Sequence, residues 1–249
     1  MRTQAAKNKT AWEYRAYEFQ NNQHGSPREE AERIMQNPDR TIRLYSKYFQ
    51  DVSGLKIANP CGSHGRIATA LAVKGASVTV FDISEGNRKY ATELAESAGV
   101  PLEYVIGDFI ETDMARYGGK FDVVLSEGGI LHYFEDIDAY TSAVFGLLKS
   151  RGRLILNDFH PFHKINQTGK TYGDYFDSAL YNGDVAYKRF FPEDERSAFP
   201  DCSLRFYTIS EIINSVIRAG FVLKSFDEVP DYDNPKIPGM FTIVAEREN

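Results

Sequence analysis

The sequence predicts an α/β fold with a mostly parallel sheet and helices on both faces. From residue 56 to residue 157, short apolar strand patterns alternate with helix patterns. Glycines or acidic residues follow several of these strands. Such alternation is typical of buried parallel strands joined by helices. The last two strands are separated by a proline-containing loop in which no helix fits, so we expect that pair to be antiparallel.

The first fifty residues predict a helical cap. An aromatic-rich segment runs from Trp12 to Phe19. The stretch Ser26–Glu29 supplies a cap residue, a proline for the first turn and a glutamate that completes a capping box. Asn37-Pro38 ends that helix and begins another, whose apolar residues recur at helical spacing: Ile42, Tyr45, Tyr48 and Phe49.

Seven strands are predicted in the remainder of the chain. They are Lys56–Asn59, Ser77–Asp82, Leu102–Ile106, Phe121–Ser126, Arg153–Asn157, Phe221–Phe226 and Met240–Ala245. Helices are predicted over Arg66–Lys74, from the cap at Ser84 to Gly99, over about Asp136–Lys149, and behind a second capping box at Thr208 and Glu211.

The segment His160–Arg205 interrupts this alternation. It is rich in aromatic residues, Gly, Asp and Pro, and it has no strong period. A long irregular segment inside a compact domain is usually a lid or a binding loop. The sequence therefore predicts a helical cap at 1–50 and a main domain at 51–249 with a lid inserted at 160–205.

Composition disfavours several classes of function. The net charge of -6 offers no basic surplus for binding a nucleic acid. We find no secretory signal pattern and no apolar run long enough to span a membrane, so a cytoplasmic protein is expected. Cys61 and Cys202 lack metal-ligand spacing, and the five histidines form no metal motif, so no metal site is predicted.

The predicted strand ends carry residues suited to a nucleoside. In an open parallel sheet, ligands bind beyond the carboxyl ends of the strands. The small-residue turn 59–65 follows the first strand and leads into a helix. Asp82 follows the second strand and can accept both hydroxyl hydrogens of a ribose. Asp108 and Phe109 follow the third, where an acid and a ring suit the amine and flat face of adenine.

On these residues the chain resembles the class I S-adenosylmethionine-dependent methyltransferases, over roughly residues 55–159. That family has a Rossmann-like sheet of seven strands with an antiparallel last strand. Its glycine motif falls here on Asn59, Cys61, Ser63 and Gly65, so only the last glycine is in place. The resemblance implies a methyltransferase domain at 51–249 that binds S-adenosyl-L-methionine. The implied cofactor-binding residues are Asn59, Cys61, Gly62, Ser63, Gly65, Asp82, Ile83, Asn87, Gly107, Asp108, Phe109, Glu127 and Gly128.

The predicted reaction is methyl transfer to a small-molecule acceptor by in-line displacement. The protein must mainly align donor and acceptor, and a general base near the acceptor would help. The candidates for that base are His132, His160 and His163, although a packing role at the strand ends is as good an explanation for His132. Aromatic residues that could contact the acceptor are Trp12, Tyr14, Tyr17, Tyr175 and Tyr181.

Three other functions stay open. One is methylation of a protein side chain, although the long aromatic segment suits an enclosed small acceptor better. The altered glycine motif is compatible with a non-catalytic methyltransferase-like protein that binds the cofactor or has lost it. An NAD(P)-dependent oxidoreductase is less well supported, because no Gly-x-Gly-x-x-Gly follows the first strand. The sequence indicates neither the acceptor, nor the atom that is methylated, nor the oligomeric state.

Overall fold

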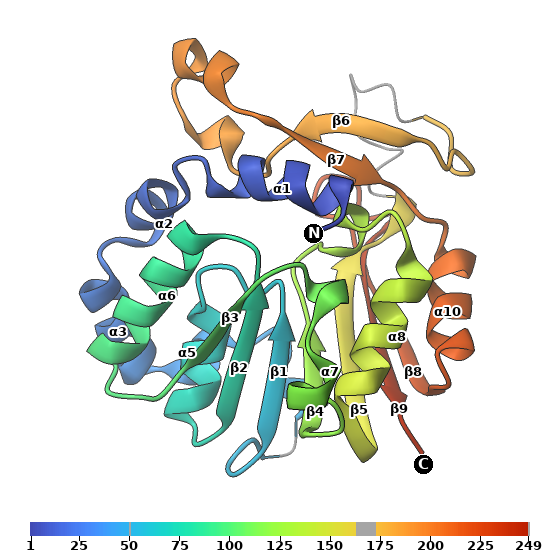
Figure 1. The fold of residues 1–249 in the computed structure, drawn as a ribbon, viewed down its shortest axis with the longest axis horizontal. Coiled ribbons are helices and arrows are strands. Elements are labelled where there is room, and N and C mark those ends of the chain that lie inside the picture. Colours follow the sequence, from blue (N-terminus) through green and yellow to red (C-terminus); the bar gives the residue numbers. More distant parts are fainter. Residues whose placement is uncertain (50, 163–172, 249) are drawn as a thin grey trace. The chain divides into compact units, whose positions relative to one another are not determined.

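A computed structural model describes residues 1–49, 51–162 and 173–248 (Figure 1). The chain divides into two compact units. Unit 1 comprises Met1–Thr112 and Asn182–Cys202, and unit 2 comprises Asp113–Tyr181 and Ser203–Asn249.

Unit 1 begins with the predicted helices. They are α1 (Thr3–Glu13), α2 (Ala16–His24), α3 (Pro27–Gln36), the short α4 (Pro38–Thr41) and the 3-10 turn η1 (Ser46–Tyr48). The capping box between Ser26 and Glu29 is confirmed, and it begins α3. The helix expected to continue to Phe49 ends instead at Thr41. Ile42 and Tyr45 are buried at 2% and 4% exposure, so their spacing reflects a packed turn rather than a longer helix.

The sheet of unit 1 has three parallel strands. β1 (Lys56–Pro60) pairs with β2 (Ser77–Asp82), and β2 pairs with β3 (Glu103–Ile106). The connecting helices are α5 (Arg66–Val73) and α6 (Glu85–Ser97), and the 3-10 turn η2 (Phe109–Glu111) follows β3. The predicted cap at Ser84 is confirmed, because its side chain accepts a hydrogen bond from Asn87 N. Parallel pairing brings the carboxyl ends of all three strands to one edge.

Unit 2 contains the other four strands of the large sheet. β4 (Phe121–Ser126) is parallel to β5 (Leu148–Phe159), and β9 (Pro238–Glu246) is antiparallel to both β5 and β8 (Val222–Pro230). The helices are α7 (Met114–Tyr117), α8 (Ile137–Leu147) and α10 (Ile209–Arg218), with the 3-10 turn η3 (Leu131–Tyr133) after β4.

Several boundaries in unit 2 differ from those expected, and the start of β5 differs most. α8 ends at Leu147 rather than Lys149, and β5 begins at Leu148 rather than Arg153. Leu148 already pairs with Phe121 of β4, and the register then shifts before Val123. Arg151 has a left-handed backbone with φ of 63° in this irregular stretch. The sequence Lys-Ser-Arg-Gly has the composition of a turn, which concealed the start of the strand.

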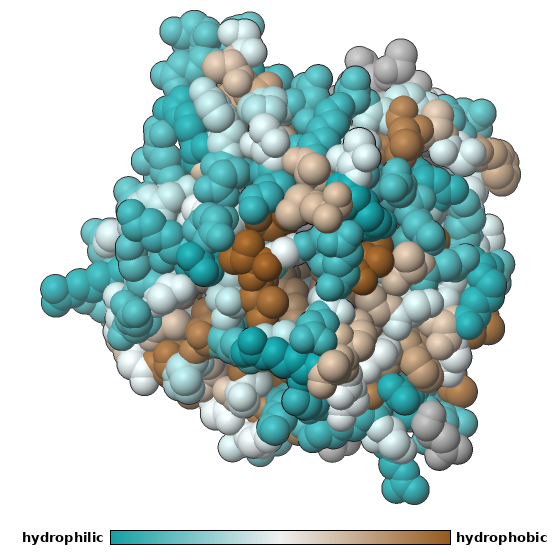
Figure 2. Space-filling model, viewed as in Figure 1, coloured by the Kyte–Doolittle hydropathy of each residue, from teal (hydrophilic) through white to brown (hydrophobic). Residues whose placement is uncertain are grey.

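The strand order is β3-β2-β1-β4-β5-β9-β8. The predicted α/β class is therefore confirmed, with seven strands, mostly parallel, and an antiparallel last strand. No helix among the described residues is long and apolar enough to cross a membrane. Hydrophilic residues predominate on the face drawn in Figure 2, where hydrophobic residues show in small groups.

Residues 173–205 contain more regular structure than their sequence indicates. β6 (Leu180–Asp184) and β7 (Asp201–Arg205) form a two-stranded sheet, and the 3-10 turns η4 (Lys188–Phe190) and η5 (Glu193–Ala198) lie between them. Within unit 1, the hydroxyl of Tyr187 lies 2.6 Å from the carbonyl of Tyr14 and packs this segment against the end of α1. The role of 160–205 as a lid stays a prediction.

Candidate functional site

The turn after β1 has an unusual backbone. Cys61, Ser63 and Gly65 have φ angles of 54°, 47° and 70°. Three alternate residues therefore lie in the left-handed region, which residues other than glycine rarely adopt. These are the positions at which the resemblance places glycines. The turn keeps a backbone suited to glycine although two of its three side chains differ.

Hydrogen bonds hold this backbone in place. Cys61 N donates to the carbonyl of Phe81 at 2.6 Å, and Ser63 N donates to the Asp82 carboxylate at 3.1 Å. The hydroxyl of Tyr104 donates to the carbonyl of Ser63 at 2.6 Å. The turn is therefore tied to the ends of both β2 and β3.

The two glycines of the turn are required by packing. A Cβ at Gly62 would lie 2.2 Å from Oδ1 of Asn59, and one at Gly65 would lie 2.7 Å from the Cβ of Ala91. Gly62 thus lets the turn close over the end of β1. Gly65 lets α5 approach α6.

Asp82 ends β2 as a buried carboxylate, with 8% of the residue exposed. One oxygen accepts from Ser84 N at 2.9 Å and the other from Ser63 N at 3.1 Å. Burial raises the pKa of Asp82, and these backbone N–H groups oppose that rise. The backbone N–H of Ile83 and the side chain of Asn87 also hydrogen bond to this carboxylate. Donors from the turn after β1 and from the start of α6 therefore hold the acid that ends β2.

Asp108 lies beyond the end of β3, next to Asp82 on the sheet edge, since Asp82 pairs with Ile106. Phe109 is 4% exposed, and its ring packs edge-on against Phe81 with centroids 5.8 Å apart. A Cβ at Gly107 would meet nothing within 4 Å, so the backbone before Asp108 faces open space. The guanidinium of Arg2 binds the Asp108 carboxylate through two hydrogen bonds.

The remaining predicted cofactor residues of unit 1 lie around Asp82. Ile83 is half-buried directly after it, and Asn87 is fully buried in the first turn of α6. The amide of Gln20 donates to Asn87 Oδ1 at 3.0 Å. The unit thus brings the β1 turn, Asp82 and Asp108 to one edge of its sheet. Two buried acids and an open backbone position fit a nucleoside cofactor there.

In unit 2, a glycine pair follows β4 and Glu127. Gly128 and Gly129 have φ angles of 87° and 82°. A Cβ at Gly128 would face open space, whereas one at Gly129 would lie 2.2 Å from the ring of Phe159. Gly129 therefore allows the Phe159 ring to lie against the loop.

A buried acid positions the 3-10 turn that carries His132. Asp158, near the end of β5, is 3% exposed. One of its oxygens accepts from Ile130 N at 2.9 Å and from Leu131 N at 2.8 Å. His132 is the next residue, so Asp158 determines where its backbone lies.

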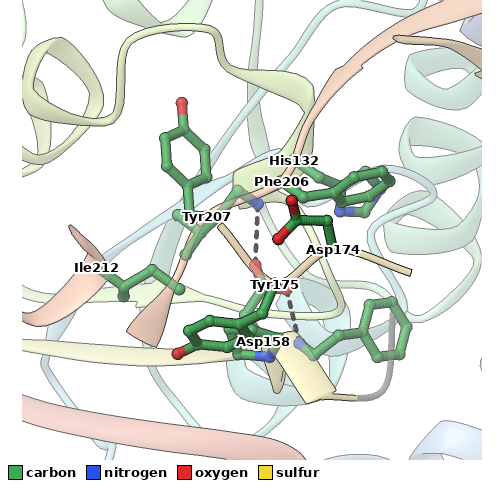
Figure 3. A pocket seen from close by; sticks show the side chains of 10 residues that line it. His132, Asp158, Asp174, Tyr175, Phe206, Tyr207 and Ile212 are labelled. Carbon is green, nitrogen blue, oxygen red and sulfur yellow. Dashed lines mark hydrogen bonds between the residues drawn. The ribbon is translucent and has the colours of Figure 1, made fainter. Parts of the chain in front are cut away.

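His132 lines a pocket with aromatic walls (Figure 3). Its ring lies 6.2 Å from that of Phe206 and 6.5 Å from that of Phe159, measured between centroids. The hydroxyl of Tyr175 accepts from Ile209 N at 2.9 Å, which fixes Tyr175 to the start of α10. The lining residues are Leu131, His132, Asp158, Phe159, Pro161, Asp174, Tyr175, Phe206, Tyr207 and Ile212.

The other two histidine candidates are placed differently. His160 is 2% exposed; its Nε2 lies 3.0 Å from a carboxylate oxygen of Glu228, and its Nδ1 accepts from Phe162 N at 3.2 Å. Burial lowers the pKa of His160, and Glu228 opposes this. Both ring nitrogens of His160 thus have structural partners, and His160 is not among the lining residues of the described pocket. His163 lies outside the described residues.

Three of the aromatic residues predicted to contact the acceptor belong to unit 1, and two belong to unit 2. In unit 1, Trp12 packs on Tyr187, Tyr14 on Phe199 and Tyr17 on Tyr90, at centroid distances of 5.5, 4.8 and 5.9 Å. In unit 2, Tyr175 lines the pocket, and the ring of Tyr181 lies 6.1 Å from that of Phe206.

Sequence reasoning missed most of the pocket and Arg2. Asp158 could have been found, because it lies near the carboxyl end of a strand, as Asp82 and Asp108 do. Phe206, Tyr207 and Arg2 lie in segments whose sequence carries no pattern for a site, and only the folded chain brings them into place.

Comparisons with known proteins identify the domain. A family model described as a methyltransferase domain matches residues 60–156. A ubiquinone biosynthesis O-methyltransferase of Rickettsia felis is 27% identical over 131 residues, which are 53% of this chain and 50% of that protein. The chain thus spans about half the length of the curated relatives it matches.

Solved structures share the fold. An S-adenosylmethionine-dependent methyltransferase structure from Listeria monocytogenes, described there as putative, has a TM-score of 0.66 at 21% identity, covering 84% of this chain and 98% of that one. Magnesium protoporphyrin IX methyltransferase from Synechocystis, solved with bound S-adenosylhomocysteine, has a TM-score of 0.63 at 18% identity, covering 98% and 99%. Residues 60–156 thus match a methyltransferase domain, and the seven-stranded sheet has the fold of these S-adenosylmethionine-dependent methyltransferase structures.

Proposed function

We propose that this protein transfers the methyl group of S-adenosylmethionine to a small-molecule acceptor by in-line displacement. The observation that carries the proposal is the edge of the unit 1 sheet, where a left-handed turn and two buried carboxylates lie at the ends of adjacent parallel strands. When bound, the cofactor supplies a methyl carbon that is already activated by the sulfonium.

Different residues of unit 1 would bind different parts of the cofactor. Asp82 would accept the ribose hydroxyls, and Asp108 would accept from the adenine amine. The turn 59–65 would hold the methionine portion with backbone groups. Charged acceptors inside a low-dielectric site make stronger hydrogen bonds than neutral ones, which supports buried carboxylates as the principal contacts.

The pocket of unit 2 would receive the methyl acceptor. Five of its ten described lining residues, His132 included, are aromatic and two are acids, and none of the ten is a lysine or an arginine. Such a lining suits a neutral, planar acceptor better than an anionic one. His132 is the histidine of the described pocket and would take a proton from an acceptor hydroxyl. Because the curated relatives are O-methyltransferases of ubiquinone biosynthesis, acceptors that carry a hydroxyl group are the first class to test.

The net charge of -6 further supports a small-molecule partner rather than a nucleic acid. A cytoplasmic location stays a prediction. Trp12, Tyr14, Tyr17 and Tyr181 stay candidates for acceptor contacts. Glu127 and Gly128, at the end of β4, stay candidates for cofactor contacts.

Calorimetric titration tests the proposal. The full chain is titrated with S-adenosylmethionine, S-adenosylhomocysteine and, as a control, NADH. We expect micromolar binding of the first two, lost in Asp82→Ala and weakened in Asp82→Asn. Asp39→Ala is a matched control, because this carboxylate is 67% exposed and pairs only at the surface with Lys74. Binding of NADH alone would contradict the proposal and favour an oxidoreductase.

A further inference from the structure

The side chain of Arg2 covers the Asp108 carboxylate. Arg2 Nε donates to one carboxylate oxygen at 3.0 Å, and a terminal nitrogen donates to the other at 3.2 Å. The side chain of Asp108 is 1% exposed, whereas that of Arg2 is 25% exposed. Arg2 therefore lies between Asp108 and solvent.

The acceptor capacity of Asp108 is largely used. Besides the two bonds from Arg2, one of its oxygens accepts from Ile110 N at 3.2 Å, which begins the 3-10 turn after β3. A carboxylate has about four acceptor positions. A carboxylate with 1% exposure cannot meet an incoming amine unless the group that covers it moves. The Ile110 N–H is part of the backbone, so Arg2 is the group that can leave.

Arg2 can leave without unfolding the helix that follows it. It is the N-cap residue of α1, in an extended conformation, and its side chain makes no capping bond. The other end of α1 is fixed independently. Glu13 accepts from the Ser84 hydroxyl at 2.9 Å and from Gly86 N at 3.2 Å, both at the start of α6.

We propose that Arg2 closes the adenine end of the cofactor site in the unliganded protein, and that a nucleoside binds only after Arg2 has left Asp108. This inference rests on the proposed function, since it takes Asp108 as the acceptor for the adenine amine. The contact from Arg2 would compete with the adenine amine for the Asp108 carboxylate. Cofactor binding would therefore be weaker, because the ion pair between Arg2 and Asp108 must first break.

The test is calorimetric titration of the full chain with S-adenosylhomocysteine and, separately, with adenosine. Wild type is compared with Arg2→Ala and Arg2→Lys. Arg28→Ala is the matched control, because Arg28 is an 85% exposed arginine of the same unit that pairs with Glu32 on its own helix. Two charge-assisted hydrogen bonds must break in wild type, so we expect Arg2→Ala to bind both ligands on the order of tenfold more tightly.

The control and the conservative variant sharpen this result. Arg28→Ala should bind as wild type does. Arg2→Lys keeps the charge but loses the two-point contact, so its affinity should fall between those of wild type and Arg2→Ala. An unfolding midpoint for each variant checks that the fold is retained.

Each outcome separates this inference from the proposed function. Binding to wild type that is unchanged or weaker in Arg2→Ala overturns the closure and leaves the cofactor site standing. Binding by Arg2→Ala alone supports the closure in its strongest form. If neither protein binds either ligand, both the closure and the proposed function are wrong.

Discussion

Replacing Cys61 and Ser63 by glycine measures the strain in the turn after β1. Both residues have positive φ, at 54° and 47°, where side chains beyond hydrogen are disfavoured. The hydrogen bonds that tie these residues to β2 and β3 use backbone atoms, which glycine also has. The substitutions therefore remove the cost of the side chain and keep those bonds.

The magnitude follows from two opposing terms. A left-handed backbone costs a residue with a Cβ about 1–2 kcal/mol. The greater freedom of glycine in the unfolded chain offsets about 0.4–1 kcal/mol of that gain. The free energy of unfolding should rise by about 0.5–1 kcal/mol at each position. In a chain of 249 residues, the double variant should raise the melting temperature by roughly 2–8 °C.

Two reverse substitutions provide a matched control. Gly65 and Gly99 have nearly equal φ angles of 70° and 68°. A Cβ at Gly99 would meet nothing within 4 Å, whereas one at Gly65 would lie 2.7 Å from Ala91. Gly99→Ala should cost only the backbone strain of about 1 kcal/mol. Gly65→Ala should cost a further 1–3 kcal/mol or so, because it overpacks the contact between helices.

Urea denaturation of wild type and the five variants, followed by circular dichroism, is the assay. The order of stability should be the double glycine variant, then wild type, then Gly99→Ala, then Gly65→Ala. The reasoning is refuted if Cys61→Gly and Ser63→Gly both lower the free energy of unfolding, because their side chains would then stabilise the turn by more than its strain.

Three further predictions follow from single contacts. Burial lowers the pKa of His24 to about 4 and that of His64 well below its ordinary value, so the unfolded chain binds more protons below pH 6.5. The contribution of these histidines to the free energy of unfolding should therefore be fully present above pH 6.5. It should fall as the pH drops toward 4, by up to about 1.4 kcal/mol per pH unit for each histidine. His64→Phe should flatten this slope in urea titrations at pH 7 and pH 5, and an unchanged slope would contradict the assignment. Tyr187→Phe removes a hydroxyl bound to the carbonyls at the end of α1 and should lower the free energy of unfolding by about 1 kcal/mol, measured by thermal denaturation against wild type. Asp158→Ala leaves two buried backbone N–H groups without their acceptor and should lower the free energy of unfolding by about 2 kcal/mol or more. It should also lower kcat and leave the KM for the acceptor unchanged, because Asp158 positions the turn that carries His132. An equal change in both constants would count against this positioning role.

Local patterns account for the part of the fold that the sequence predicts. The caps at Ser26, Ser84 and Thr208 are formed by residues within four positions of one another, so short motifs identify them. Buried parallel strands are continuous apolar runs, and the acids at their ends stand out against them. For this reason the sequence predicts Asp82 and Asp108 as carboxylates at strand ends.

Contacts between distant segments account for what the sequence did not predict. The pairing of Arg2 with Asp108 joins residues 106 positions apart, and no periodicity encodes it. Phe206 joins the pocket from the segment between β7 and α10, which resembles an ordinary connection in sequence. The start of β5 at Leu148 depends on its partner strand, because Leu148 pairs with Phe121.

A crystal structure of the full chain with S-adenosylhomocysteine would locate the cofactor directly. We expect the nucleoside at the edge of the unit 1 sheet, with its ribose hydroxyls on Asp82, its adenine amine on Asp108 and Arg2 displaced from that carboxylate. A nucleoside bound away from both acids would rule out the proposed cofactor site.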